Sequence, residues 1–449
     1  MLPRPRPSAI AFLLLPFLAA AGAAQPQVSP PVRTEAPPLL PPSPRLAGLA
    51  WQLAQGDRAA LERFWAEIDR HGTPLLEAVP AGAEGGPSLL LTFLWRGTAE
   101  RAVVLLGTIG QDAPLVRLDG TDVWYRTYRL RRDLRFTYRL APVRGAIPLD
   151  PTAPGYDREK IRATAQVDPR NPHRYPPTGP PLLSLVEMPE APPQPWVGVR
   201  KGVPAGRVER GSLKSLRLAG VREVAVYTPA GYLGGRGDRA PYPLLVVFDG
   251  SAYLDLLPLP RMLDNLRAAG ALPAVVAVFV GRLEAVERDR DLSCFSPFTA
   301  FLAEELLPWV RSRYRVTTDP ARTVLVGSSR GGLATACAAL DHPELFGNVL
   351  AQSGSFPWRP PGDPAPEWLR RRVLSLPRLP LRFHLDVGLL ETQLPPQGGP
   401  SLLDASRRLY DALQVKGYAV DYAEYAGGHG HVNWQGTLPD GLRALLGQR

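Results

Sequence analysis

The stretch "TVLVGSSRGGLATACAAL", Thr323 to Leu340, joins a short apolar run to an alanine-rich run through a glycine-rich turn with two adjacent serines. The first run is rich in β-branched residues and predicts a strand, and the second predicts a helix. A sharp strand-to-helix turn of the form Gly-x-Ser-x-Gly, a nucleophile elbow, exposes a serine hydroxyl above a sheet. The stretch therefore indicates an α/β fold and raises the question of which serine is reactive.

Glycine spacing favours Ser329 as the nucleophile. The crowded turn needs residues without side chains two positions before and two positions after the nucleophile. For Ser329 these residues are Gly327 and Gly331, whereas for Ser328 they would be a valine and an arginine. The alternative is an ordinary helix start in which one of the two serines caps backbone amides.

A serine hydroxyl needs a base, and in this fold class the acid and then the histidine follow the serine along the chain. His429 follows two glycines in a loop after the strand-like run 418–425 and is the predicted base. His431 is the alternative. His384 lies inside the strand-like run 381–388, where a role in the core or on the sheet surface fits better.

The acid is expected after the penultimate strand. Glu391 lies in the loop beyond that strand and Asp386 lies within it, so Glu391 is preferred as the group that fixes the tautomer of the histidine. An oxyanion hole needs two backbone N–H groups. One is predicted at Arg330, directly after the nucleophile, and the other around Ser251 and Ala252, after "LLVVFDG".

From about residue 201 to residue 449, apolar runs alternate with helical runs. Nearly unbroken apolar runs are typical of strands covered on both faces of a parallel sheet, so we predict an α/β catalytic domain over 201–449. The strand-like runs cover 221–229, 242–250, 272–281, 322–327, 348–354 and 381–388, and covering helices are predicted at 298–314, 332–346 and 401–418.

The chain begins with arginines, an apolar run and small residues, which predicts a secretory signal peptide over 1–24. The apolar run is too short for a comfortable membrane span. No cysteine lies near the cleavage point, so a lipid anchor is not expected. A Pro-rich linker follows over 25–44. We therefore expect an exported protein, located in the bacterial periplasm, with no membrane span in the mature chain.

Two further regions precede the catalytic domain. Residues 45–145 contain a helical pattern over 46–72 and then short β-branched and aromatic runs between turn residues, which predicts a leading helix and a small β-sandwich. Residues 146–200 are Pro-rich and are predicted to be a connector.

The 449 residues carry a formal net charge of +10, which favours anionic partners. The arginines are scattered and no nucleic-acid motif accompanies them, so nucleic-acid binding is not expected. Cys294 and Cys337 are the two cysteines. An oxidising compartment would permit a disulfide, but one pair is no framework, and two separate thiols are favoured. Metal-site spacing is absent from the sequence, and no cofactor is expected.

The stretch from Thr323 to Trp358, "TVLVGSSRGGLATACAALDHPELFGNVLAQSGSFPW", resembles the elbow segment of the enterochelin esterase family, which hydrolyses ferric catecholate siderophores. The resemblance runs from about Ala60 to the C-terminus and implies an early-set β-sandwich before an α/β-hydrolase domain. The other similar segments, in order, are "FLWRG", "LDGTDVWYRTYRL", "DPRNP", "SLVEMPEAPPQP", "LLVVFDGSAY", "RDRDLSC", "FLAEELLPWV" and "GGHGHVNWQG".

This resemblance implies that Ser329 attacks the ester bonds of a cyclic tri-serine lactone carrying catecholates. His429 would act as base and then as acid, with Glu391 orienting it. Asp249 and Gly250 match the end of the family's oxyanion strand.

Substrate contacts are expected from Arg288, Arg330 and Trp434. Arg288 matches an arginine that the family places over the active site, and Arg330 stands where the family usually has an aromatic residue. Gly430 replaces an aspartate and Gln435 an arginine of the family pattern. Because a ferric tris-catecholate is a trianion, Arg288, Arg330 and Arg290 are chemically suitable partners.

Two other functions are considered. A carbohydrate or feruloyl esterase of the related esterase-D group would use exposed aromatic residues such as Trp124 and Tyr125 to stack on sugar. A secreted binding protein without turnover is the non-enzymatic alternative, and an intact serine, acid and histidine in order argues against it.

Overall fold

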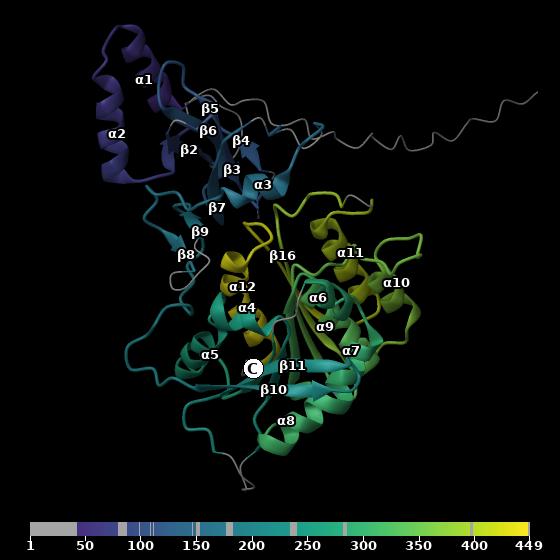
Figure 1. Cartoon of the computed structure of the whole chain (residues 1–449). Helices are drawn as coiled ribbons and strands as arrows, with labels where there is room; N and C mark the ends of the chain where they lie inside the picture. The colour runs from purple at the N-terminus through teal and green to yellow at the C-terminus, as the bar shows by residue number, and fades with distance from the viewer. Residues whose placement is uncertain are drawn as a thin grey trace, which may run out of the picture. The chain divides into compact units, whose positions relative to one another are not determined.

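The computed structural model describes most of the chain from residue 43 onward (Figure 1). The predicted signal peptide, 1–24, lies outside the described residues, as does the predicted linker up to residue 42. No helix among the described residues is long and apolar enough to cross a membrane. The described ranges are 43–79, 88–97, 99–107, 109–110, 112–145, 147–149, 153–176, 183–233, 240–281, 285–395 and 398–447.

An eight-stranded sheet in the order β10-β11-β13-β12-β14-β15-β16-β17 forms the centre of the C-terminal part. β10 and β11 are antiparallel to their neighbours, and the strands from β13 to β17 are parallel. The α/β class predicted from the alternating runs is therefore confirmed. The strands are β10 (Arg207–Ser215), β11 (Gly220–Thr228), β12 (Leu244–Val247), β13 (Val276–Val280), β14 (Thr323–Ser328), β15 (Asn348–Gln352), β16 (Arg382–Gly388) and β17 (Ala419–Tyr425).

Helices cover both faces of this sheet (Figure 1), which explains why its central strands are apolar throughout. In β12, Leu244 and Val246 belong to the core on one face, and Leu245 and Val247 belong to the core on the other. Burying each such side chain stabilises the fold by about 1.5–3 kcal/mol. One face is covered by η1 (Phe301–Leu306), α7 (Ser296–Ala300), α8 (Leu307–Arg313), α9 (Arg330–Asp341), α10 (Trp368–Ser375) and α11 (Leu402–Val415), and the other by α4 (Gly250–Asp255), α5 (Leu259–Ala268) and α12 (His431–Leu446).

The N-terminal part contains two sheets, β1-β2-β6-β5 and β4-β3-β7-β9-β8, that share one core. Phe93 from the first sheet packs against Phe136 and Tyr138 from the second. The β-sandwich predicted from the short aromatic runs is thus present. Its strands are β1 (Leu75–Ala78), β2 (Ser88–Arg96), β3 (Arg101–Leu105), β4 (Ala113–Pro114), β5 (Val116–Arg117), β6 (Val123–Arg131), β7 (Arg135–Val143), β8 (Arg174–Tyr175) and β9 (Leu183–Glu187).

Two details differ from the sequence-based expectation. The leading helical pattern forms two helices, α1 (Pro44–Ala54) and α2 (Ala60–His71), because the chain turns at Gly56 with φ of +85°. The segment 146–200, predicted as a connector, contributes α3 (Arg158–Ala163) and the strands β8 and β9, of which β9 pairs with β7. The many prolines around these short elements led to the prediction of a connector without helices or strands. The domain boundaries themselves stay a prediction.

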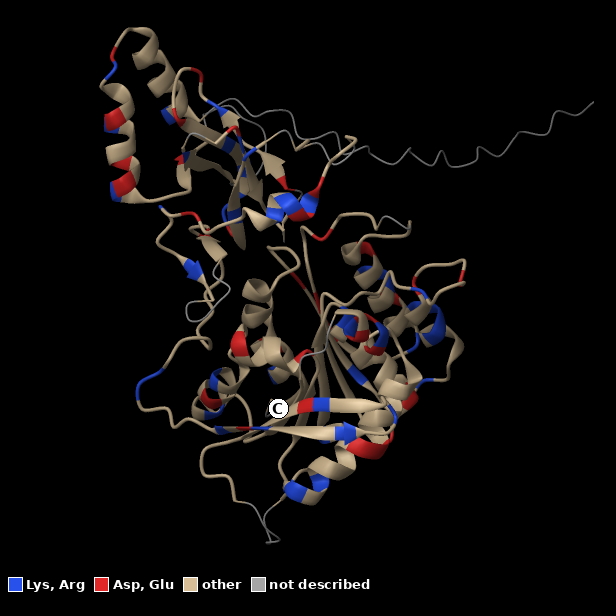
Figure 2. Ribbon diagram, in the orientation of Figure 1, with Lys and Arg blue, Asp and Glu red and all other residues tan. Residues whose placement is uncertain are grey.

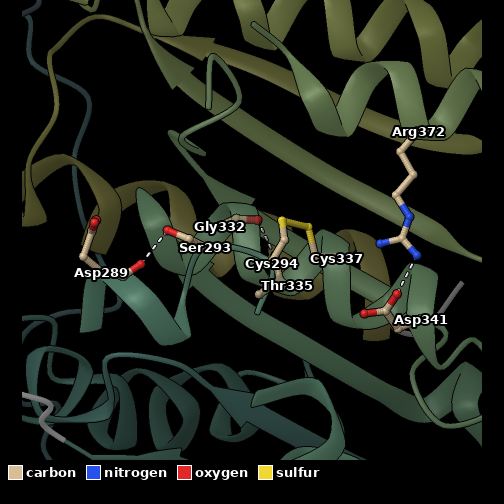
Figure 3. The surroundings of a disulfide bond; sticks show 8 residues. All are labelled: Asp289, Ser293, Cys294, Gly332, Thr335, Cys337, Asp341 and Arg372. Atoms are coloured by element: carbon tan, nitrogen blue, oxygen red, sulfur yellow. Dashed lines mark hydrogen bonds and ion pairs between the residues drawn. A yellow bond between two sulfur atoms is a disulfide. The ribbon is translucent and has the colours of Figure 1, made fainter. Parts of the chain in front are cut away.

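The two cysteines, expected as separate thiols, form a disulfide, so that expectation was wrong (Figure 3). The Cα atoms of Cys294 and Cys337 lie 5.4 Å apart although 43 positions separate them in the sequence. Cys337 is buried in α9, and Cys294 follows α6 (Ala285–Asp291). Sequence spacing could not reveal this contact because the fold, and not the local pattern, brings the two segments together.

His384 in β16 is a buried histidine between two carboxylates. Its Nδ1 lies 2.6 Å from Asp421 Oδ2, and its Nε2 lies 3.7 Å from Asp386 Oδ2. Burial alone would lower the pKa of His384, but the two carboxylates outweigh it and raise the pKa to about 9. The structure therefore places His384 in the core of the sheet, one of the two positions expected for it.

This cluster predicts a pH dependence of stability. An unfolded histidine has a pKa of about 6.5. The stabilisation by charged His384 is therefore complete below about pH 6.5 and lost as the pH rises through about 9, a loss on the order of 1–3 kcal/mol. The free energy of unfolding of wild type, measured with urea, should fall over this interval more steeply than that of His384→Asn. Parallel pH profiles of the two proteins would contradict the assignment.

Candidate active site

Ser329 lies at the turn between β14 and α9 with φ of 56° and ψ of −120°. This backbone conformation is strained for a residue with a side chain, at about 1–3 kcal/mol. Hydrogen bonds hold it, since the Ser329 N–H donates to Gln352 O and the Ser329 carbonyl accepts from the N–H of Ser355. Ser329 is partly exposed, whereas Ser328 is buried at the end of β14.

Two glycines make this turn possible. A Cβ at Gly327 would lie 2.5 Å from the carbonyl carbon of Gly331, closer than real Cβ contacts come. A Cβ at Gly331 would meet Asp249 Oδ2 at 3.3 Å. The backbone around Ser329 is therefore as crowded as the choice of Ser329 over Ser328 requires, with no room for a side chain at position 327 and little at position 331.

Glu391 and His429 form a direct pair. His429 Nδ1 lies 2.7 Å from Glu391 Oε2, and the carboxyl group is almost fully buried. The other oxygen, Oε1, accepts from the Gly388 N–H at 2.8 Å, from the Ser353 hydroxyl at 2.6 Å and from the Tyr425 hydroxyl at 3.2 Å. These donors fix the carboxylate so that Oε2 faces the imidazole.

Ser353, Tyr425 and Trp434 support this pair, and no sequence motif pointed to the first two. The Trp434 indole N–H donates to Ser353 Oγ at 3.0 Å. Burial raises the pKa of Tyr425 well above its ordinary value, which keeps its hydroxyl a hydrogen-bond donor. Ser353 lies just beyond β15, Tyr425 ends β17 and Trp434 lies in α12, so only the assembled fold brings them to the pair.

Trp434 occupies a supporting position. Its side chain is 4% exposed, and its ring makes edge-to-face contacts with His429 at 4.9 Å and with His431 at 5.1 Å between centroids. These contacts orient both imidazoles. The contact with substrate predicted for Trp434 stays a prediction.

The alternative acid is buried in the sheet, whereas the alternative base, His431, lies against the same Trp434 ring as His429. Asp386 is fully buried, and its Oδ2 accepts from Gln352 Nε2 at 3.2 Å. Among the described carboxylates, the one that contacts His429 is that of Glu391. Burial lowers the pKa of His431, at the start of α12, to about 4, so its ring is uncharged at neutral pH.

The predicted oxyanion donors lie at two helix starts. Arg330 is the first residue of α9, and α4 begins at Gly250 after Asp249, which has φ of 51°. The Ala252 N–H already donates to the Asp249 carbonyl at 2.8 Å. The first N–H groups of a helix have no intrahelical acceptor. Ser251 therefore suits the role better than Ala252.

Each arginine expected to contact substrate also has a carboxylate partner. Arg288 makes a bidentate contact with Asp249, with Nε–Oδ1 at 2.6 Å and Nη2–Oδ2 at 2.7 Å. Arg330 Nε lies 3.1 Å from Asp289 Oδ1. Arg290 Nε donates to the carboxylate of its neighbour in sequence at 2.7 Å. Basic and acidic residues occur on helices, strands and loops of the described chain (Figure 2).

Two other sequence expectations concern binding groups. Trp124 is 8% exposed and its indole N–H donates to the Gly97 carbonyl, so it packs in the sandwich core and offers little surface to a sugar. The described residues contain no group of three or more His, Cys, Asp or Glu side chains that could hold a metal ion.

The chain matches two known protein families in order. Residues 90–197 match the family described as enterochelin esterase, N-terminal, and residues 215–445 match the family described as putative esterase. An iron(III) enterobactin esterase of Dickeya dadantii is 31% identical, and the match covers 90% of this chain and 97% of the relative. An iron(III) salmochelin esterase of Escherichia coli O6:H1 is 29% identical, with 90% and 98% covered.

Solved structures agree in fold over both parts of the chain. The enterobactin esterase of Shigella flexneri, crystallised in the presence of 2,3-dihydroxy-N-benzoyl-serine, is similar with a TM-score of 0.66 at 29% identity. That match covers 86% of this chain and 98% of the other. The ferric enterobactin esterase of Salmonella typhimurium is similar with a TM-score of 0.68 at 26% identity, and the match covers the same shares of the two chains. Because both parts match in order and almost end to end, the chain belongs to the enterochelin esterase family and is a carboxylic ester hydrolase.

Proposed function

We propose that this chain is a serine esterase that hydrolyses the ester bonds of a ferric catecholate siderophore of the enterobactin type and so aids iron release. The observation that carries the proposal is the 2.7 Å contact between His429 and Glu391 in a chain that also carries the elbow at Ser329. Its relatives, named as enterobactin and salmochelin esterases, support the choice of substrate class.

In the proposed reaction, Ser329 attacks the carbonyl carbon of a serine ester. Glu391 accepts the Nδ1 hydrogen of His429, which leaves Nε2 free to take the proton of the serine hydroxyl. The N–H groups of Arg330 and Ser251 stabilise the tetrahedral oxyanion. His429 then gives the proton to the departing ester oxygen, which leaves as a seryl hydroxyl, and water releases the acyl group by the same steps.

The rim of the proposed site suits an anionic substrate. Arg288 and Arg330 carry positive charge next to the elbow, and the bidentate contact with Asp249 orients the guanidinium of Arg288. Iron(III) belongs to the substrate in this account. The catecholate oxygens around it would accept hydrogen bonds from those guanidinium groups.

A comparison of three esters tests the proposal. We expect purified enzyme to cleave ferric enterobactin and, more slowly, p-nitrophenyl acetate, and to leave a feruloylated sugar largely intact. Preferred cleavage of the feruloylated sugar would favour the carbohydrate or feruloyl esterase alternative. Binding of ferric enterobactin without cleavage of any ester would favour the binding-protein alternative.

The two serines should differ sharply in mutational effect. Ser329→Ala removes the proposed nucleophile and should lower kcat for ferric enterobactin by roughly 10³-fold or more. Ser328→Ala should keep most of the activity because its side chain is buried at the strand end. Product formation followed by chromatography measures both. Equal losses in the two variants would remove the basis for choosing Ser329.

The proposed base and acid can be separated by their variants. His429→Ala should resemble Ser329→Ala, and the double variant should be little worse, because the groups act as a unit. Glu391→Gln keeps the shape of the side chain but loses the charge and should cost less than His429→Ala. Asp386→Asn is the matched control. A larger kcat loss in Asp386→Asn than in Glu391→Gln would show that the acid is misassigned.

We also propose that the mature protein is exported to the periplasm. The composition of residues 1–24 supports this, and the Cys294–Cys337 disulfide suits an oxidising compartment. N-terminal sequencing of protein isolated from its native cell should give a mature start near Ala24 or Gln25. A native protein that keeps Met1 and fractionates with the cytoplasm would contradict export.

A further inference from the structure

The helix α6 has ionic contacts at the starts of both α4 and α9. Arg288 of α6 makes its bidentate contact with Asp249, the residue before α4. Asp289 of α6 contacts Arg330, the first residue of α9. One short helix therefore supplies an ionic partner to each of the two helix starts that carry the proposed oxyanion donors.

A covalent bond joins the same segments. Cys294 lies three residues after the end of α6, and Cys337 is fully buried in α9 (Figure 3). Figure 3 also shows the Ser293 hydroxyl donating to the Asp289 carbonyl, a contact that continues the link back into α6. The disulfide thus connects the turn after α6 to the helix that begins at Arg330.

The ionic contact between α6 and α9 is too exposed to fix the spacing of these helices by itself. In the pair between Arg330 and Asp289 the carboxylate side chain is 64% exposed. A single ion pair in such a position is weak and screened by salt. The C-terminal end of α6 has a buried anchor, the pair between Asp291 and Arg222 of β11, but that anchor lies on the sheet and not on α9.

We propose that the Cys294–Cys337 disulfide is a positioning element of the substrate site that keeps the guanidinium groups of Arg288 and Arg330 aligned for an anionic substrate. This inference rests on the proposed siderophore esterase function. Without the bond, the exposed pair between Arg330 and Asp289 is the ionic contact that the described residues show between α6 and α9, and the two charges lose their fixed spacing. A neutral ester that needs only Ser329 and its partners is insensitive to that spacing.

The test uses the mature enzyme and its Cys294→Ala/Cys337→Ala variant. Alanine is chosen because Cys337 lies in the hydrophobic core, where a serine hydroxyl would be buried. We expect KM for ferric enterobactin to rise about 5- to 10-fold with kcat within twofold, the response of a group that binds rather than reacts. For p-nitrophenyl acetate, kcat/KM should stay within twofold.

Two controls separate positioning from general destabilisation. Leu413→Ala in α11 truncates a residue of the same core cluster far along the chain from α6 and should leave KM for ferric enterobactin unchanged. Wild type reduced with dithiothreitol, which forms two protein thiols and oxidised dithiothreitol, should shift KM in the same direction as the double variant. Failure of either control, or equal losses on both substrates, overturns the proposal.

Hydrogen exchange gives a readout that does not depend on the substrate. Backbone amides of residues 285–295 should exchange faster in the double variant than in wild type, while those of α11 should not. Unchanged exchange in 285–295 would show that the disulfide does not hold α6. If wild type cleaves p-nitrophenyl acetate but not ferric enterobactin, the proposed function fails, and the exchange result still decides the role of the disulfide.

Discussion

At the elbow, the backbone of Gly331 occupies the space that a side chain at position 327 would need. A Cβ there would lie only 2.5 Å from the carbonyl carbon of Gly331. Because position 327 is a glycine, the chain can pass from β14 into α9 within a few residues, with Ser329 at φ of 56° and ψ of −120°. The Gln352 carbonyl, at the end of the neighbouring strand, holds the Ser329 N–H in that conformation. The position of the serine therefore follows from one steric constraint and one hydrogen bond across the sheet.

The other groups of the site reach the elbow because parallel strands end on the same side of the sheet. Ser353 follows β15, Glu391 follows β16, and Tyr425 ends β17. The hydroxyl groups of Ser353 and Tyr425 both donate to Glu391 Oε1 and leave Oε2 for His429. A buried carboxylate needs such partners because removing it from water is costly without them. The acid is therefore placed by three successive strands and not by its own loop alone.

Local patterns were sufficient where the signal was steric or apolar. The central strands were predictable because burial on both faces demands unbroken apolar runs, and the register around Ser329 followed from its glycines. β10 was missed because this edge strand is largely polar, and α12 was missed because it contains Gly436, Pro439 and Gly441. The contacts of Ser353 and the partner of Cys294 arise only in the assembled fold, so no sequence spacing could reveal them.

Site mapping of a fluorophosphonate adduct tests the central claim most directly, because the probe reacts only with a serine that a base activates. After labelling of the folded enzyme and proteolysis, mass spectrometry should find one adduct, on the hydroxyl of Ser329, and none in His429→Ala. Labelling of Ser328 would show that the glycines do not set the register of the elbow. Absence of any adduct on a folded, active enzyme would contradict the serine mechanism itself.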